Sequence, residues 1–337
     1  MSLPKFLLIS ALLLVGCAKL PPAEPSTPPV DISECYAGRM YMPDPVCMYR
    51  HIDALNSPET GFVARQTSNG LTRIVHIDPR SGQVSTIVDT SWSGVHPVWV
   101  TGHRAIAYEF GSSKTDGIGS CATNGQFEFS LTLWINAPMF RTSEPMFGRG
   151  FDDFGYLFQW TGNDMADTAA VIHTYTDSTI ARLPLEYGNP FNCRMSRDGR
   201  WMVCQATNVR GILRINRGTG EVRRVIETEA FEPALSPDGR KIVYGEMVRQ
   251  SGINPSQRIY LADIAEDGTV TNQVILAGPR FEHAVASPVF SPDGKTMAYI
   301  FSGGGDERDM IYYHSLTSDA DPRPIWVTSH IGRLDWQ

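Results

Sequence analysis

Two decapeptides in the chain are nearly identical, and their recurrence is the strongest constraint on its fold. Residues 235–244 read LSPDGRKIVY and residues 290–299 read FSPDGKTMAY. A proline begins each of these units, and three further prolines begin weaker copies. Successive prolines lie 43 to 55 residues apart: Pro97, Pro145, Pro190, Pro233 and Pro288. A period of this length is typical of repeat architectures, in which each unit buries its surface against its neighbours.

The segments between these copies have the pattern of β-hairpins. Six such segments occur, each with an alternating or apolar run, a short turn containing Gly, Asp or Pro, and a second run, as in residues 71–88 and 211–227. Period-two alternation between turn residues predicts strands. Two hairpins over about 45 residues are the pattern of one four-stranded propeller blade.

The predicted fold class is an all-β propeller over residues 56–337, with six blades of four strands. Seven blades are the alternative, if residues 35–55 supply strands. The first unit, residues 56–92, lacks an opening strand, whereas residues 334–337 are an opening strand with nothing after it. We expect this C-terminal strand to complete the first blade, because ring closure removes two unpaired sheet edges.

The repeats resemble the TolB-like propeller repeat, a WD40-like repeat also called PD40. The matching features are SPDG turns, Ile-Tyr pairs in later strands and a Thr-Gly turn: residues 236–239 and 291–294, the SRDG variant 196–199, residues 259–260 and 311–312, and residues 219–220. The resemblance covers about residues 56–337, is strongest in the last three units and implies a propeller fold.

TolB itself carries an α/β domain before its propeller, for which residues 18–55 are too few. The chain is therefore expected to be a TolB-like propeller without that domain. The contacts of TolB with the Tol–Pal envelope system are not carried over, because the elements that bind those partners are not matched.

The N-terminus has the pattern of a lipoprotein signal peptide, residues 1–17. Lys5 precedes the apolar run 6–15, and Leu14-Val15-Gly16-Cys17 resembles a lipobox whose cysteine takes a lipid. An ordinary signal peptide with a chance cysteine is the alternative. Ala18 lacks the character of an inner-membrane retention signal, so we expect the outer membrane, with the propeller in the periplasm. Residues 18–34 then form a proline-rich tether and residues 35–55 a lead-in segment.

Two disulfide bonds are predicted, because exported proteins fold in a compartment that permits them. Cys35 and Cys47 would close a small loop, and Cys193 and Cys204 lie at equal distances from a predicted hairpin turn. Cys121 would remain unpaired. The alternative is that some of these residues are buried, reduced thiols.

No catalytic residue, metal site or cofactor is predicted, since GxSxG, P-loop and EF-hand patterns are all missing from the sequence. Loops entering the inner strands do carry polar residues that could line the funnel on the propeller axis. These candidates are His96, Glu232, Glu282, His283 and His330. They could converge on a ligand, or they are ordinary polar loop residues.

The sequence leaves two functional hypotheses. The first is a non-catalytic scaffold that binds an envelope protein or peptide, since the chain combines an anchor, a tether and a repeat fold. The second is a periplasmic enzyme, or a binder of a small ligand or glycan, that uses the axial funnel. Nucleic acid is not an expected partner, because the net charge is −7 and phosphate binding needs a basic surface.

Overall fold

The structure of the chain is a computed structural model. The described residues are 33–36, 44–55, 58–68, 71–90, 96–111, 115–126, 128–135, 140–148, 154–160, 168–174, 179–248, 256–277, 284–302, 309–318, 322–326 and 330–337. Residues 32–337 form one compact unit, and residues 1–31 are a separate unit outside the described residues. The predicted signal peptide, with Cys17, therefore lies outside them. No described helix is long and apolar enough to cross a membrane.

The described strands form six four-stranded antiparallel sheets, and five of these are built from strands consecutive in the sequence. Sheet 1 contains β24 (His330–Trp336), β1 (Phe62–Ser68), β2 (Leu71–Ile77) and β3 (Val84–Thr90). Sheet 2 contains β4 (Val98–Trp99), β5 (Ala105–Gly111), β6 (Thr115–Ala122) and β7 (Phe129–Ile135). Sheet 3 contains β8 (Phe140–Phe147), β9 (Phe154–Trp160), β10 (Thr168–Thr174) and β11 (Thr179–Pro184), followed by the short helix η3 (Leu185–Tyr187).

The last three sheets carry the best-matched repeats. Sheet 4 contains β12 (Pro190–Met195), β13 (Trp201–Ala206), β14 (Val209–Asn216) and β15 (Val222–Ile226). Sheet 5 contains β16 (Ala230–Leu235), β17 (Lys241–Val248), β18 (Ser256–Ile264) and β19 (Val270–Ala277). Sheet 6 contains β20 (Ala284–Phe290), β21 (Thr296–Ser302), β22 (Met310–Ser315) and β23 (Arg323–Trp326).

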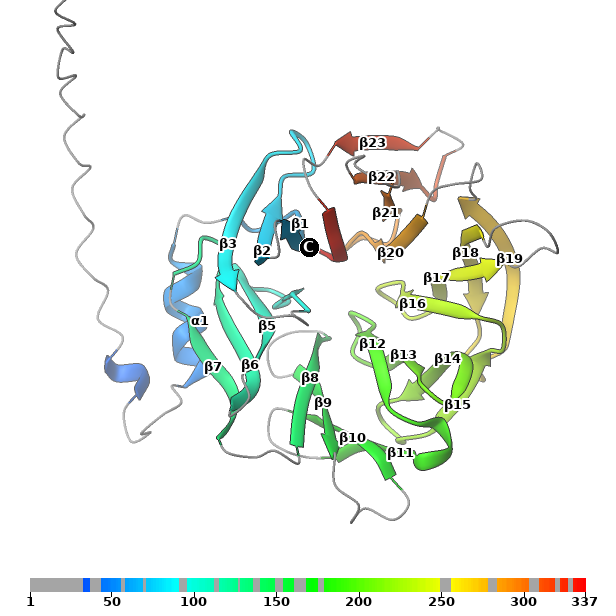
Figure 1. Ribbon diagram of the computed structural model, residues 1–337, viewed down its shortest axis with the longest axis horizontal. Helices are drawn as coiled ribbons and strands as arrows, with labels where there is room; N and C mark the ends of the chain where they lie inside the picture. The colour runs from blue at the N-terminus through cyan, green and yellow to red at the C-terminus, as the bar shows by residue number, and fades with distance from the viewer. Residues whose placement is uncertain are drawn as a thin grey trace, which may run out of the picture. The chain divides into compact units, whose positions relative to one another are not determined.

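The sheets surround a common axis, as Figure 1 shows, so the fold is a propeller. One edge strand of each sheet faces this axis, and we call these the inner strands: β4, β8, β12, β16, β20 and β24. Each inner strand contacts the inner strands of the two adjacent sheets. Apolar side chains between neighbouring sheets form the core, as where Val203 and Ile212 of sheet 4 pack with Ile242 and Tyr244 of sheet 5.

Sheet 1 joins the two ends of the described unit. The C-terminal strand β24 pairs antiparallel with β1, with Trp336 opposite Phe62 and Leu334 opposite Ala64. Beyond this ladder, the Gly61 N–H donates to the Gln337 carbonyl at 2.7 Å and the Gln337 N–H donates to the Gly61 carbonyl at 3.1 Å. Leu334 is fully buried between sheets 1 and 6. The C-terminal strand begins at His330, four residues before the predicted start.

The SPDG segments form the turns that follow the inner strands. In the copy after β16, the Ser236 hydroxyl donates to Asp238 at 2.7 Å and accepts from the Lys241 N–H at 2.8 Å. Gly239 has a φ of +67°, and a Cβ there would lie 2.7 Å from the Trp201 ring. The glycine is therefore required by both backbone conformation and space.

Four inner strands contain a bulge residue in the left-handed backbone region although none is glycine. These residues are Asn192, Glu232, Ser287 and Arg333, with φ between +46° and +51°. The ladder skips a position at each of them. Cys193 follows its bulge residue as Pro233 and Pro288 follow theirs. Pro190 was predicted to be equivalent to these two prolines, but the equivalent residue is Cys193, three positions later.

The described residues of the predicted lead-in segment 35–55 form helices and turns, not strands. The short helix η1 (Ser33–Tyr36) and helix α1 (Pro45–Asp53) precede the first strand. The Asp44 carboxylate caps α1, and Met48, Tyr49 and Ile52 are buried against sheet 2. These helices lie outside the sheets of the propeller, and the described residues of this segment do not supply the strands that seven blades would need, so the seven-blade alternative was wrong.

Both cysteine pairs are joined in the structure. Cys35 in η1 is bonded to Cys47 in α1, with Cα atoms 5.4 Å apart. Cys193 in β12 is bonded to Cys204 in the adjacent strand β13, with Cα atoms 4.2 Å apart. Cys121 is a buried free thiol, and desolvation raises its pKa.

Ring closure gives a prediction for β24. Leu334→Ala should lower the free energy of unfolding by about 2–5 kcal/mol, because it leaves a cavity at a fully buried position. Leu71→Ala in the same sheet is the matched control, since Leu71 is 50% exposed and its loss should cost less than about 0.5 kcal/mol. Urea unfolding followed by circular dichroism measures both, and equal losses would contradict the packing described.

The SPDG turn gives a pH-dependent prediction. The Ser291 hydroxyl and then the Lys295 N–H donate to Asp293, and they hold the pKa of its carboxyl below the ordinary 3.8. A carboxyl group with a lowered pKa in the folded state stabilises the fold at pH values above its unfolded-state pKa. This contribution disappears as the pH falls through the folded-state pKa. Asp293→Ala should therefore cost less than about 1 kcal/mol at neutral pH, because the site is exposed, and still less near pH 2. Urea unfolding at both pH values tests this, and a pH-independent loss would refute it.

Candidate functional site

The axis of the propeller holds a cavity of about 70 Å³. Every inner strand contributes to its wall: Trp99, Met146, Arg194, Leu235, Phe290 and Asp335. The wall combines aromatic and apolar side chains with a few charged groups, the composition expected of a ligand site. The cavity lies beside the turns that follow the inner strands, since Arg197 and Pro237 also line it.

An ion pair between Arg194 and Asp335 dominates the charge in this cavity. Nη1 of Arg194 lies 3.2 Å from Oδ1 of Asp335, and the side chains are 12% and 25% exposed. Oδ2 of Asp335 accepts a hydrogen bond from the Trp99 N–H at 2.7 Å. Asp335 therefore joins inner strands from three sheets, and partial burial makes its loss costly.

Arginine side chains also cross the axis. Nη2 of Arg194 donates to the Leu334 carbonyl, and Nη2 of Arg197 donates to the Trp336 carbonyl at 3.0 Å. In the reverse direction, Nη2 of Arg333 donates to the Cys193 carbonyl at 2.9 Å. Sheets 1 and 4 lie opposite each other in the ring, so these bonds connect its two halves.

Arg197 brings a second cationic group to the cavity. Burial lowers the pKa of its guanidinium, and the Asp335 carboxylate opposes that shift. This part of the wall carries the guanidinium groups of Arg194 and Arg197 and the carboxylate of Asp335, so its net charge is positive. A carboxylate from a ligand would complete the charge balance.

Of the five predicted funnel residues, the structure describes the side chains of His96 and Glu232. His96 lies 2.7 Å from Glu109 of the adjacent strand β5, and both side chains are mostly buried. Glu232 accepts a hydrogen bond from the Ser287 N–H in the next sheet. Glu282 and His283 lie outside the described residues, and His330 begins β24 with a side chain that is not described.

Arg194, Arg197 and Asp335 were not among the funnel residues predicted from the sequence, although the repeat pattern is unusual at Arg197. Arg197 stands in the SRDG variant where the other copies have proline. This departure from the repeat pattern distinguishes Arg197 from the turn residues of the other copies. Asp335 has no comparable local signal, because its partners Trp99 and Arg194 lie in other sheets.

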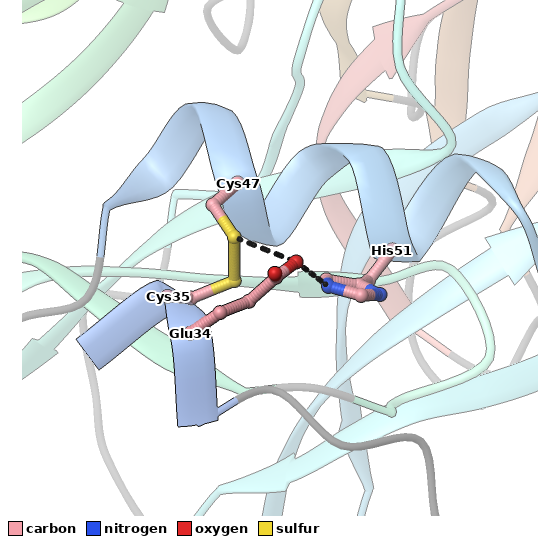
Figure 2. A group of neighbouring side chains, drawn as sticks. All are labelled: Glu34, Cys35, Cys47 and His51. Carbon is pink, nitrogen blue, oxygen red and sulfur yellow. Dashed lines mark hydrogen bonds and ion pairs between the residues drawn. A yellow bond between two sulfur atoms is a disulfide. The ribbon is translucent and has the colours of Figure 1, made fainter. Parts of the chain in front are cut away.

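A second group of chemically active residues lies away from the axis. Glu34, Cys35, Cys47 and His51 bring potential metal-ligand atoms within 4.8 Å of one another, as Figure 2 shows. Among the described residues, no other group of three or more His, Cys, Asp or Glu side chains lies so close together.

Comparison with known proteins identifies the fold but no family. No family model matches the chain, and no curated protein matches its sequence. The crystal structure of TolB from Acinetobacter baumannii is similar, with a TM-score of 0.60 and 19% identity over 82% of this chain and 66% of that one. Putative TolB from Agrobacterium tumefaciens is less similar, with a TM-score of 0.45 and 14% identity over 66% of this chain and 82% of that one. Oligogalacturonate lyase in complex with manganese has a TM-score of 0.48 and 13% identity over 77% of this chain and 74% of that one.

The similarity to the Acinetobacter structure shows that the chain has a TolB-like propeller fold. The match spans just under two thirds of the Acinetobacter protein. At this level of identity, the comparison concerns architecture and does not transfer activity or partners.

The axial ion pair can be tested by its effect on stability. Asp335→Ala should lower the free energy of unfolding by about 3 kcal/mol, because it removes the acceptor for Arg194 and for the Trp99 N–H. The control is Asp89→Ala, which removes an exposed partner of Arg73 and should cost less than about 1 kcal/mol. Urea unfolding measures both variants, and similar losses would show that Asp335 does not hold the inner strands together.

Proposed function

We propose that this chain is a lipid-anchored cell-envelope protein whose TolB-like propeller binds a segment of a partner protein without catalysing a reaction. The observation that carries the proposal is the axial cavity, to which every inner strand contributes and which has a net positive part of its wall. The predicted lipobox and tether support the location, since they would hold the propeller near a membrane in the periplasm.

The size of the cavity favours a side chain or chain end as its occupant. A cavity of roughly 150 Å³ is the size that holds benzene in an engineered protein core. The axial cavity has less than half that volume, about 70 Å³, so a complete sugar ring does not fit without rearrangement. A peptide can instead insert one group and rest its remaining residues on the surrounding turns.

The chemistry of the wall favours a carboxylate on that inserted group. The partly buried side chain of Arg197 donates to the Trp336 carbonyl, and Arg194 is already paired with one carboxylate. Guanidinium groups bind carboxylates in a planar, directional way. Trp99, Phe290 and Trp336 line the same cavity and supply apolar contact area. We therefore infer a peptide with an acidic side chain or a free C-terminus.

No described contact favours the enzymatic alternative. A catalyst at the axis would need converging acid–base or metal-ligand groups. Of the predicted candidates, His96 contacts Glu109, whereas Glu232 contacts Ser287 on a different strand. The similarity to oligogalacturonate lyase is too weak to transfer its activity.

Site-specific photocrosslinking tests the proposed binding. A photoreactive amino acid at Thr101, which lines the cavity, should capture one defined envelope protein in intact cells. The same residue placed at Val274, which is 49% exposed on the outer strand β19, should not capture it. Arg197→Met should reduce capture at Thr101 by about ten-fold or more, because it removes a charge-assisted hydrogen bond. Equal capture at both positions, or none at Thr101, would refute the proposal.

Cys17→Ala separates anchoring from binding. If Cys17 carries the lipid, this variant should lose fatty-acid labelling and leave the membrane fraction. The purified variant should still bind the captured partner, because the cavity belongs to residues 32–337. Unchanged fatty-acid labelling would contradict the lipobox interpretation alone.

A further inference from the structure

Two short helices bring four metal-ligand side chains together outside the propeller. Glu34 and Cys35 belong to η1, while Cys47 and His51 lie one turn apart on the same face of α1 (Figure 2). Nε2 of His51 lies 3.2 Å from Oε1 of Glu34, and the same oxygen lies 3.8 Å from Sγ of Cys47. The group therefore presents one nitrogen, one carboxylate oxygen and two sulfurs.

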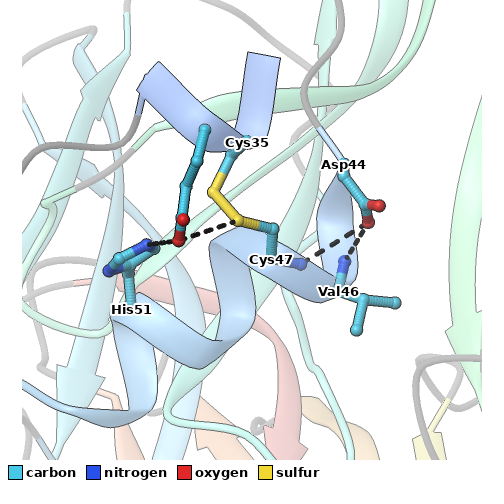
Figure 3. Close-up of a disulfide and its surroundings, with 6 residues drawn as sticks. Cys35, Asp44, Val46, Cys47 and His51 are labelled. Atoms are coloured by element: carbon cyan, nitrogen blue, oxygen red, sulfur yellow. Dashed lines mark hydrogen bonds and ion pairs between the residues drawn. A yellow bond between two sulfur atoms is a disulfide. The ribbon is translucent and has the colours of Figure 1, made fainter. Parts of the chain in front are cut away.

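The surrounding contacts hold the two helices that carry these side chains. The Asp44 carboxylate accepts hydrogen bonds from the Val46 N–H at 2.9 Å and the Cys47 N–H at 3.5 Å (Figure 3). The Asp44 N–H donates to the Cys35 carbonyl at 2.7 Å, which joins the two helices independently of the disulfide. On the opposite face of α1, the Tyr49 hydroxyl donates to Ser120 at 3.0 Å. The ligand group is therefore held on a docked element.

The group is open to solvent on one side. The Cys35 residue is 1% exposed, whereas the side chains of His51 and Glu34 are 21% and 66% exposed. An ion can therefore approach past Glu34, while Cys35 lies at the inner end of the site and Cys47 is partly buried. This arrangement provides both an entry path and a partly shielded position.

We propose that Glu34, Cys35, Cys47 and His51 form a redox-gated Zn²⁺ site, which is closed while the Cys35–Cys47 disulfide is intact and binds the ion after the disulfide is reduced. Two thiolates, an imidazole and a carboxylate are all ligands that Zn²⁺ takes in tetrahedral sites. At zinc–ligand distances of about 2.0–2.3 Å, the ligand atoms lie roughly 3.3–3.8 Å from one another. The four donors already lie within 4.8 Å of one another, so small side-chain rotations suffice.

The chemistry balances with a thiol as reductant. Two thiols of the reductant become one disulfide, and their two electrons and two protons convert the Cys35–Cys47 bond into two cysteine thiols. Zn²⁺ then displaces both thiol protons to solvent and binds the two thiolates. Nε2 of neutral His51 and the Glu34 carboxylate complete the coordination. The bound ion replaces the disulfide as the link between η1 and α1.

The Cys193–Cys204 disulfide is an internal control for the proposed zinc site. Cys193 and Cys204 join neighbouring strands of sheet 4, and the described residues place no group of His, Asp or Glu ligands with them. Reduction of this bond would yield two thiols without the additional ligands of a tetrahedral site. The zinc proposal is therefore specific to one of the two bonds, and it does not depend on the proposed peptide binding.

The test measures zinc bound by the full-length chain, purified in detergent. One sample stays oxidised, and the other is reduced with a phosphine, which is oxidised by taking up the oxygen of one water. After anaerobic gel filtration with Zn²⁺, the reduced protein should retain about one equivalent, and the oxidised protein should retain far less. Co²⁺ in place of Zn²⁺ should give the visible absorption bands of tetrahedral thiolate coordination.

Three variants assign the ligands. Cys193→Ser combined with Cys204→Ser should leave zinc binding unchanged. His51→Ala should weaken it by about ten-fold or more, and Glu34→Gln should weaken it to a smaller extent, because each removes one ligand. Both changes are at side chains with solvent exposure, and circular dichroism verifies that the fold is retained. The proposal is overturned if the reduced protein retains no zinc, or if His51→Ala binds it as tightly as the unmodified chain.

Discussion

The pairing of β24 with β1 is the interaction on which the propeller depends. It joins strands more than 260 residues apart in the sequence and supplies sheet 1 with its inner strand. Without β24, β1 would expose an unpaired edge and the neighbouring core would lose Leu334. The axial site depends on the same strand, because Asp335 and the carbonyls of Leu334 and Trp336 receive bonds from sheet 4. Ring closure and site assembly are therefore one event.

Local sequence chemistry was sufficient to predict the propeller and its strand-completed first sheet. SPDG-type turns in the last three sheets and alternating hairpins throughout the repeats depend on short-range geometry, which a sequence shows directly. Residues 35–55 could not be interpreted in the same way, because their helices are short and outside the repeat. The sequence PVCMYRHID has Asp44 before Pro45, which is a helix-start signal, but its apolar side chains acquire their role only by docking on sheet 2. The turns and hairpins of the propeller follow from local sequence, whereas the docking of α1 depends on contacts with residues that are distant in the sequence.

The candidate site was harder to predict than the fold. His96 and Glu232 were selected because they lie near the entry of inner strands, and the bulges and neighbouring strands give them separate partners. Arg194 and Asp335 meet although 141 residues separate them, and a single sequence carries no trace of such a contact. Cys35 and Cys47 were paired correctly by proximity, whereas Glu34 and His51 were not associated with them. The missing information was the orientation of α1 relative to η1.

The left-handed bulges of the inner strands have a consequence for mutational studies. Each non-glycine residue there carries a backbone cost of roughly 1 kcal/mol, yet its side chain or N–H also bonds to a neighbouring or opposite sheet. Glycine at Glu232 would relieve the backbone while deleting the carboxylate that accepts from Ser287. The two effects have opposite signs, so a stability scan would record a small net change. A residue that connects two blades would then be scored as dispensable, and only measurements on paired substitutions would reveal the connection.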